Sequence, residues 1–335
     1  MNIPRHDTIV WPALLLCGAL QLFGCATLHT ARATANNGRV IVITGASSGF
    51  GKGVALELAD QGAHLVLAAR RTELLDELAR ECETRGGQAL AVTTDVSSAN
   101  DVERLAGATL ARFGRIDVWI NVAGIGVVGR FEDIPLADHH RLVDVNLKGV
   151  INGSYYAMRQ FRAQGSGTLI NIASVAGRVA LPYYPSYSAT KHAVVGLGAA
   201  LNQELRLNGD RDIHVSTILP YAADTPWFLH AANYSGHQPD MVLMDSADKV
   251  VDAIVKATFK PKVEVAVGYK AKAVVAAHRI GRRLTEDVAG LITHDSLMKS
   301  APAPATAGSL YEPVPEGTGV SGGLRERKAA EDANR

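Results

Sequence analysis

One stretch of the chain joins a strand, a glycine-rich turn and a helix in direct succession. Residues 39–44 (Arg-Val-Ile-Val-Ile-Thr) form a short β-branched run that is typical of a buried parallel strand. The run leads into Gly45-Ala-Ser-Ser-Gly49-Phe-Gly51, and a helical pattern of apolar residues begins at Val54. Such glycines let the backbone approach a pyrophosphate, which binds at the N-terminus of the helix. The stretch therefore predicts a dinucleotide-binding turn within an α/β fold.

Strand-like and helix-like segments go on alternating after this turn. Further strands are expected at residues 64–69, 89–93, 116–122, 168–173, 213–219 and 263–267. Further helices are expected at residues 73–85, 101–113, 135–164, 187–205 and 247–259. Alternation of this kind indicates βαβ units and a parallel sheet.

The end of the second expected strand bears on the choice of dinucleotide. An acidic residue at this point would hold a ribose 2′-hydroxyl, whereas an arginine accommodates a 2′-phosphate. The strand ends in Ala69 and is followed by Arg70 and Arg71. We therefore expect NADP rather than NAD, with Arg70 as the residue that binds the 2′-phosphate. The alternative is that both arginines are solvated charges at the start of a helix.

A serine, a tyrosine and a lysine form the candidate catalytic group. Ser174 follows the expected strand at 168–173, at the sheet edge where open α/β sheets bind their ligands. Tyr187 and Lys191 are four residues apart, so on a helix their side chains share one face. An unperturbed tyrosine titrates near ~10, and a lysine ammonium one turn away can lower that pKa. We therefore predict that Tyr187 is a general acid/base and that Ser174 polarises a carbonyl.

Charge and cysteine content exclude several classes of protein. The formal net charge of +1 over 335 residues gives no general attraction to nucleic acid or to an anionic membrane. Of the three cysteines, Cys17 and Cys25 lie in an N-terminal apolar run, which leaves Cys82 and no internal disulfide framework. No Cys/His cluster has metal-ligand spacing. We expect neither a metal site nor nucleic-acid binding.

Residues 1–38 are expected to be a hydrophobic segment followed by a linker. Residues 8–28 contain no charge, and this run is just long enough to span a membrane. A transmembrane anchor, a cleaved signal and a lipoprotein signal acylated at Cys25 all remain open. Arg32 and Arg39 have no acidic neighbour, so the positive-inside tendency favours an anchor with the catalytic domain on the cytoplasmic side. The alternative is an exported lipoprotein.

The pattern weakens beyond residue 268, where we place the end of a catalytic domain that spans residues 39–268. Residues 269–298 interleave basic and apolar side chains. They could form a basic amphipathic helix on a membrane, or a helix packed on the domain or on a second subunit. Residues 299–335 begin with Ala-Pro repeats and continue as Gly-rich, charged sequence, which predicts a disordered tail.

The combined motifs resemble the short-chain dehydrogenase/reductase family, in its simple single-domain branch. The resemblance covers about residues 39–268 and rests on Thr44-Gly-Ala-Ser-Ser-Gly-Phe-Gly51, Asn121-Val-Ala-Gly124, Asn146, Ser174, Tyr187 and Lys191. It implies an α/β fold with a Rossmann-type, doubly wound sheet of seven parallel strands. It also implies a homodimer or homotetramer formed through the helices at 135–164 and 187–205.

The resemblance further implies roles that the residues alone do not give. Asn146 would hold a water that links Lys191 to solvent, and Lys191 would also bond the nicotinamide ribose. Thr225 would bind the carboxamide, while Asp95 and Val96 would border the adenine. The cofactor-binding residues expected in total are Gly45, Ser47, Ser48, Gly49, Gly51, Arg70, Asp95, Val96, Asn121, Ala123, Gly124, Tyr187, Lys191, Pro220 and Thr225.

Two residues depart from the family pattern. Val122 stands where a second asparagine is usual, and Tyr221 follows Pro220 where glycine is common. A ring at position 221 would crowd the nicotinamide or reshape the substrate pocket.

The function expected from these features is that of an NADP-dependent oxidoreductase acting on CH–OH groups. It would interconvert an alcohol and its ketone or aldehyde, with Asn146, Ser174, Tyr187 and Lys191 as the catalytic set. The apolar residues of segment 221–244 suggest a small, apolar substrate. A membrane-tethered NADP-binding sensor without turnover is the alternative, although a sensor needs no proton relay.

Overall fold

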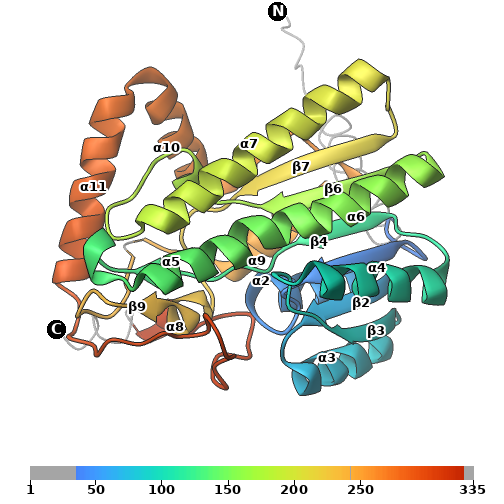
Figure 1. Cartoon of the computed structure of the whole chain (residues 1–335), viewed down its shortest axis with the longest axis horizontal. Coiled ribbons are helices and arrows are strands. Elements are labelled where there is room, and N and C mark those ends of the chain that lie inside the picture. The colour runs from blue at the N-terminus through green and yellow to red at the C-terminus, as the bar shows by residue number, and fades with distance from the viewer. Residues whose placement is uncertain (1–34, 242, 328–335) are drawn as a thin grey trace, which may run out of the picture.

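Seven parallel strands form the central sheet of the molecule (Figure 1). The computed structural model describes residues 35–241 and 243–327. The strand order is β11-β7-β6-β4-β1-β2-β3. The first three strands of the chain, β1 to β3, form one half of the sheet, and the later strands β4, β6, β7 and β11 form the other half. The strands are β1 (Val40–Thr44), β2 (His64–Ala69), β3 (Gln88–Thr93), β4 (Val118–Asn121), β6 (Gly167–Ile172), β7 (Ile213–Leu219) and β11 (Glu264–Ala266). The doubly wound parallel sheet is confirmed.

Helices cover both faces of this sheet, which is why the inner strands β1, β4 and β6 are buried along their whole length. One face carries α2 (Gly49–Ala59), α3 (Thr72–Thr84) and α9 (Ala247–Phe259). The other carries α4 (Ala99–Phe113), α6 (Gly149–Gln164) and α7 (Pro185–Asn208). Alternate residues of β1 point into the two resulting cores: Ile41 and Ile43 into the first, and Val42 into the second.

The long helical pattern at 135–164 is interrupted by one wide turn. Here α5 (Leu136–Val143) continues through a π-helical turn, η2 (Asp144–Lys148), into α6. Turns of this kind add one residue to the helix and are frequent at functional sites. Asn146 lies at the centre of this turn and is fully buried.

Short elements beside the carboxyl edge of the sheet build the walls of a cleft. Two small parallel pairs are β5 (Val127–Val128) with β9 (Ala232–Asn233), and β8 (Ala223–Asp224) with β10 (Asp245–Ser246). Single turns occur at η1 (Phe131–Asp133), η3 (Val175–Gly177) and α8 (Trp227–His230). The apolar segment that starts at Tyr221 is therefore largely irregular, and two short strand pairs, β9 with β5 and β8 with β10, hold it against the rest of the domain.

The region at 269–298 forms two helices that pack on the domain. These are α10 (Gly268–Ile280) and α11 (Arg282–Met298), which meet at Gly281. Ala271 and Val275 of α10 and Leu297 of α11 are buried by this packing. No helix within residues 35–241 and 243–327 is long and apolar enough to cross a membrane. The hydrophobic run at 8–28 lies outside the described residues.

The segment after α11 differs from the disordered tail that its composition predicts. Residues 299–327 run back across the domain, pair with the 233–237 segment at Thr306 and Pro302, and bury Leu310 completely. Its glycines allow this packing. A Cβ at Gly308, whose φ is +50°, would lie 2.4 Å from the carbonyl oxygen of His230.

Candidate active site

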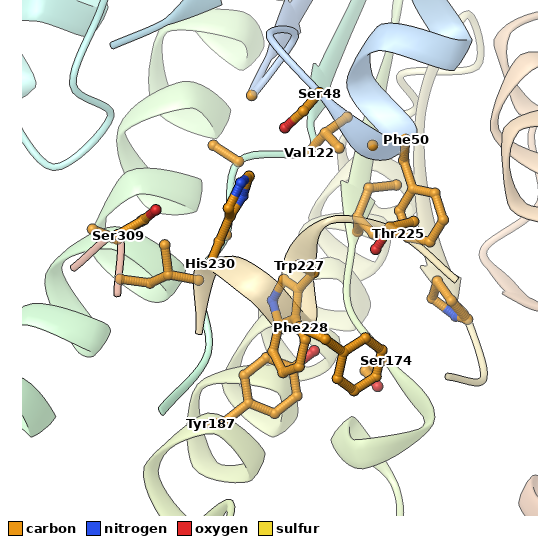
Figure 2. A pocket seen from close by; sticks show the side chains of 18 of the residues that line it. Ser48, Phe50, Val122, Ser174, Tyr187, Thr225, Trp227, Phe228, His230 and Ser309 are labelled. Carbon is orange, nitrogen blue, oxygen red and sulfur yellow. The ribbon is translucent and has the colours of Figure 1, made fainter. Parts of the chain in front are cut away.

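The cleft opens at the carboxyl ends of β1, β4, β6 and β7, beside the point where the strand order reverses. Open α/β sheets bind their ligands at this place. Figure 2 shows Ser174, Tyr187, Trp227 and Phe228 gathered at one end of the cleft, with Ser48, His230 and Ser309 farther along it. The expected catalytic and dinucleotide-binding regions therefore line one continuous pocket.

Ser174 and Tyr187 lie in hydrogen-bonding contact at the inner end. Ser174 follows β6 in extended conformation, and its Oγ accepts a hydrogen bond from the backbone N–H of Ala176 at 3.1 Å. Tyr187 stands in the first turn of α7, which begins at Pro185, a favoured residue for the first helical position. Burial raises the pKa of Tyr187 to about 12, although the hydrogen bond with Ser174 acts in the opposite direction. At neutral pH the phenol therefore keeps its proton.

Lys191 lies one helical turn from Tyr187, as the spacing predicts. Its Nζ donates to the carbonyl of Ile172 at 2.9 Å and lies 5.6 Å from the centre of the Tyr187 ring. Burial lowers the pKa of Lys191 to about 8. The sequence led us to expect an ammonium that lowers the tyrosine pKa. In the structure burial dominates both groups, because each loses hydration that no opposite charge replaces.

Asn146 is fixed by the backbone opposite the π-helical turn. Its Oδ1 accepts from the N–H of Ile125 at 2.8 Å, and its Nδ2 donates to the carbonyl of the same residue at 2.9 Å. A Cβ placed on Gly124 would lie 3.5 Å from Asn146 Oδ1 and 3.7 Å from Lys191 Nζ. The two side chains therefore border one small space beside Gly124.

The glycine-rich turn has the shape and charge that a dinucleotide requires. Gly45 adopts φ +71°, and a Cβ there would lie 2.8 Å from the backbone of Ala123, while a Cβ on Gly51 would lie 2.2 Å from the carbonyl of Gly45. These close approaches bring the N-terminus of α2 up to the cleft. The first turn of α2 carries no acidic residue, so nothing there repels a phosphate. The residues present fit a dinucleotide.

Two arginines stand at the adenosine end of the cleft. Arg71 donates to the hydroxyls of Ser47 at 3.1 Å and Ser48 at 2.8 Å, within the glycine-rich turn. Arg70 is held by backbone carbonyls of the C-terminal segment, at 2.6 Å from Ser309 O and 2.8 Å from Tyr311 O. Burial lowers the pKa of both guanidinium groups. The site therefore presents positive charge where a 2′-phosphate would bind.

The remaining expected cofactor residues divide into two groups. Asp95, Val96, Ala123, Pro220 and Thr225 line the cleft. Asn121 does not, because its side chain lies inside the protein, where it accepts from Trp119 Nε1 and donates to Asn171 Oδ1, each at 2.8 Å.

Asp95 is bound by a residue that the sequence did not indicate. Arg141 donates to its carboxylate at 2.7 Å. Burial would raise the pKa of Asp95, but the hydrogen bonds from Arg141 and Ser97 keep it below its usual value.

Aromatic rings form the substrate side of the cleft. Trp227 packs edge-on against Tyr187 with ring centres 5.2 Å apart, and Tyr184 is stacked on Trp227 at 6.5 Å. The hydroxyl of Tyr184 is buried and has no hydrogen-bond partner. Tyr221 lies in the wall of the cleft, with Lys270 Nζ 5.8 Å from its ring centre.

Among the lining residues that sequence reasoning missed are Tyr184, His230, Ser309 and Pro313. Tyr184 alone had a local signal, since it precedes the expected catalytic helix. His230 ends the single-turn helix α8, and Ser309 and Pro313 lie in an irregular segment, so no periodicity marks any of the three. Within the described residues, no cluster of His, Cys, Asp and Glu side chains could hold a metal ion.

Comparison with known proteins identifies the class to which this fold and site belong. The family model for short chain dehydrogenase matches residues 39–233. The chain therefore belongs to the short-chain dehydrogenase family and is an NAD(P)-dependent oxidoreductase acting on CH–OH groups.

Relatives of known sequence are similar over most of the chain. An uncharacterized oxidoreductase of Bacillus subtilis, YxnA, is 33% identical over 278 residues, which cover 82% of this chain and 78% of the relative. The putative oxidoreductase SadH of Mycobacterium tuberculosis is 32% identical over 251 residues, covering 72% of this chain and 91% of SadH.

Two solved structures share the fold. A short-chain dehydrogenase/reductase from Burkholderia phymatum in complex with NAD is 25% identical, with a TM-score of 0.66, and the match covers 81% of this chain and 98% of that one. An alcohol dehydrogenase from Thermococcus sibiricus complexed with 5-hydroxy-NADP is 29% identical, with a TM-score of 0.57, and covers 65% of this chain and 88% of that one.

Proposed function

We propose that the protein is an NADP-dependent oxidoreductase that interconverts a small, apolar alcohol and its ketone or aldehyde. The observation that carries the proposal is the contact between Ser174 and Tyr187, with Lys191 one turn away, at the inner end of a cleft suited to a dinucleotide. A nicotinamide dinucleotide would supply or accept the hydride at the carbonyl carbon.

Proton transfer is the task of Tyr187. A hydroxyl whose pKa is raised to about 12 holds its proton at neutral pH and can donate it to the oxygen of a carbonyl during reduction. The Ser174 hydroxyl, oriented by the N–H of Ala176, would hydrogen-bond the same oxygen and polarise the carbonyl.

Lys191 and Asn146 would restore the proton. A lysine whose pKa is lowered to about 8 exchanges its proton near neutral pH more readily than an exposed lysine does. Asn146 borders the same space beside Gly124 and could hold a water that connects Lys191 to solvent. Lys191 would in addition bond the nicotinamide ribose.

Preference for NADP follows from the charges at the adenosine end. Arg70 and Arg71 stand at the carboxyl end of β2, where the strand offers Ala69 and no carboxylate for a ribose 2′-hydroxyl. The Thermococcus sibiricus neighbour was solved with a compound of the NADP type, and the Burkholderia phymatum neighbour with NAD. Arginine is suited to bidentate recognition of a phosphate.

The aromatic walls indicate the substrate. Trp227, Phe228, Tyr184, Tyr221 and Met241 line the part of the cleft that lies beyond Tyr187. Such a lining favours an apolar carbonyl compound with few charged groups. A panel of aliphatic, aromatic and alicyclic ketones and aldehydes, assayed with NADPH and with NADH, tests the proposal. Absence of turnover with every compound, in a protein that binds NADPH, would favour the sensor alternative.

Membrane attachment through residues 8–28 is a further proposal, which rests on the uncharged run and the arginines that follow it. We expect the catalytic domain to sediment with membranes and to resist protease in intact spheroplasts until they are lysed. Digestion before lysis would instead support the exported lipoprotein acylated at Cys25, and recovery in the soluble fraction would contradict attachment.

A further inference from the structure

The C-terminal segment from Ser309 to Arg325, here called the strap, runs along the part of the cleft where the dinucleotide is expected to bind. It starts beside Arg70 at the adenosine end and finishes on Asp224, next to Thr225. Ser309 and Pro313 of the strap line the cleft itself. The strap is therefore part of the cofactor site.

The strap bonds the same donors that a dinucleotide phosphate would use. The backbone N–H of Gly49, at the start of α2, donates to the carbonyl of Gly319 at 2.9 Å. Lys52, one turn further along α2, donates to the carbonyl of Thr318 at 3.3 Å. The N-terminus of this helix is the expected pyrophosphate site, so the strap carbonyls take the place of phosphate oxygens at its edge.

Both arginines of the adenosine end are also bonded to the strap. Arg70 donates to the carbonyls of Ser309 and Tyr311, and Arg71 donates to the carbonyl of Val314 at 3.3 Å. A neutral carbonyl is a weaker acceptor for guanidinium than a phosphate dianion. These bonds therefore hold the strap closed and can be exchanged for bonds to a cofactor.

The far end of the strap is fixed independently of the cofactor. The buried carboxylate of Asp224 accepts from the N–H groups of Leu324 at 3.0 Å and Arg325 at 3.2 Å, and from the hydroxyl of Ser321 at 3.2 Å. A Cβ on Gly322 would lie 2.5 Å from the carbonyl of Thr225, so only glycine permits this approach.

We propose that the strap is a gate over the dinucleotide cleft, which must open before the cofactor can enter or leave. The proposal rests on the dinucleotide binding in the proposed function and holds for NADP and NAD alike. Opening breaks the contacts at Arg70, Arg71 and Gly49, while Asp224 keeps the far end in place as the anchor.

Stopped-flow fluorescence of NADPH binding tests the gate. In the parent protein the observed rate should level off as NADPH concentration rises, because strap opening limits entry. The variant Gly322→Val cannot dock the strap, so its rate should rise linearly and NADPH should dissociate at least about tenfold faster. Gly107→Val is the matched control, since a Cβ on Gly107 meets nothing within 4 Å.

A truncation that ends after Tyr311 repeats the test without any substitution. It keeps the fully buried Leu310 and the three carbonyl partners of Arg70, but it removes the contacts with Gly49 and Asp224. It should also bind NADPH without a plateau. Cleavage by a glutamate-specific protease at Glu316, which is followed by glycine, gives a readout that needs no cofactor, and Gly322→Val should be cut faster than Gly107→Val.

Three outcomes would overturn the gate. The first is a linear rate in the parent protein with equal dissociation rates in all variants. The second is loss of NADPH binding in Gly322→Val and in the truncated protein, which would make the strap a binding surface instead. The third is equal protease cleavage of Gly322→Val and Gly107→Val. If the parent protein binds neither NADPH nor NADH, the proposed function itself fails.

Discussion

Burial acts in opposite directions on the two titrating residues of the active site. It raises the pKa of Tyr187 to about 12 and lowers that of Lys191 to about 8. Both shifts favour the uncharged form of the side chain, because each charge would lose its hydration in the cleft. In the proposed mechanism the pair therefore acts at neutral pH as a proton donor beside a base of moderate strength.

Replacing Tyr187 by phenylalanine tests its role directly. The ring and its contact with Trp227 are kept, whereas the proton that the mechanism requires is lost. We expect turnover to fall by at least about 10²-fold, with NADPH affinity largely retained. Steady-state kinetics and NADPH fluorescence measure the two quantities, and turnover near that of the parent protein would contradict the mechanism.

The lowered pKa of Lys191 predicts how the stability of the folded protein changes with pH. The folded-state pKa of about 8 lies below the ordinary lysine value of 10.5, so the folded protein is penalised for holding the proton at every pH below about 8. The penalty shrinks between pH 8 and 10.5, where only the unfolded chain still binds the proton. Lys191→Met should therefore be more stable than the parent protein at pH 7, by at most ~3 kcal/mol, and lose that advantage by pH 10.5. Urea unfolding at both pH values measures the difference, and an advantage that grows with pH would refute it.

At the scale of elements, regular patterns in the sequence predicted the structure well. Helix α9 and strand β7 begin and end where the pattern places them, because buried apolar residues repeat with a clear period. The π-helical turn at Asn146 could not be predicted, since an added residue leaves the apolar stripe nearly unchanged. The strap was missed because its order comes from backbone contacts of glycines and from the buried Leu310, neither of which has a period.

In the candidate site too, the residues placed by regular elements could be predicted, whereas a residue placed by contacts between strands could not. The positions of Ser174, Tyr187 and Lys191 follow from a strand end and from one helical turn, both of which the sequence predicts. Asn121 was expected among the cofactor-binding residues, but its side chain does not line the cleft. It bonds Trp119 on its own strand and Asn171 on the neighbouring strand β6, and the sequence alone does not state that β4 and β6 pair.

The residues at the carboxyl end of β2 are predicted to set the preference for NADP over NAD. Ala69→Asp combined with Arg70→Ser would place a carboxylate where a ribose 2′-hydroxyl binds and would remove a charge-assisted bond to phosphate. Because such a bond is worth about 1.5–3 kcal/mol, we expect the kcat/KM ratio of NADPH to NADH to fall by at least about tenfold. Arg80→Ser, at an exposed position of α3, is the control. A parent protein that already prefers NADH would contradict the assignment.

At the scale of the whole molecule, exposed apolar residues suggest how subunits associate. Ile151 and Tyr155 lie four residues apart on α6 and are 44% and 55% exposed. The neighbouring helix α7 exposes small residues, among them Gly196 and Ala200, which allow close helix approach. We expect a homodimer formed through α6 and α7.

Light scattering of the purified protein tests this assembly. Ile151→Asp should shift the dimer towards monomer, because it places a charge in an apolar contact. Leu207→Asp is the control, since Leu207 is 87% exposed at the far end of α7. A parent protein that is monomeric at micromolar concentration, or equal behaviour of both variants, would rule out this interface.

Lys270 gives the C-terminal helices an influence on what the cleft accepts. From α10 it bonds the buried carboxylate of Asp245 at 3.0 Å and lies over the ring of Tyr221 in the wall of the cleft. A change in how α10 packs would therefore move that wall without touching Ser174, Tyr187 or Lys191. Related chains that differ only beyond residue 268 would therefore catalyse the same reaction on different substrates.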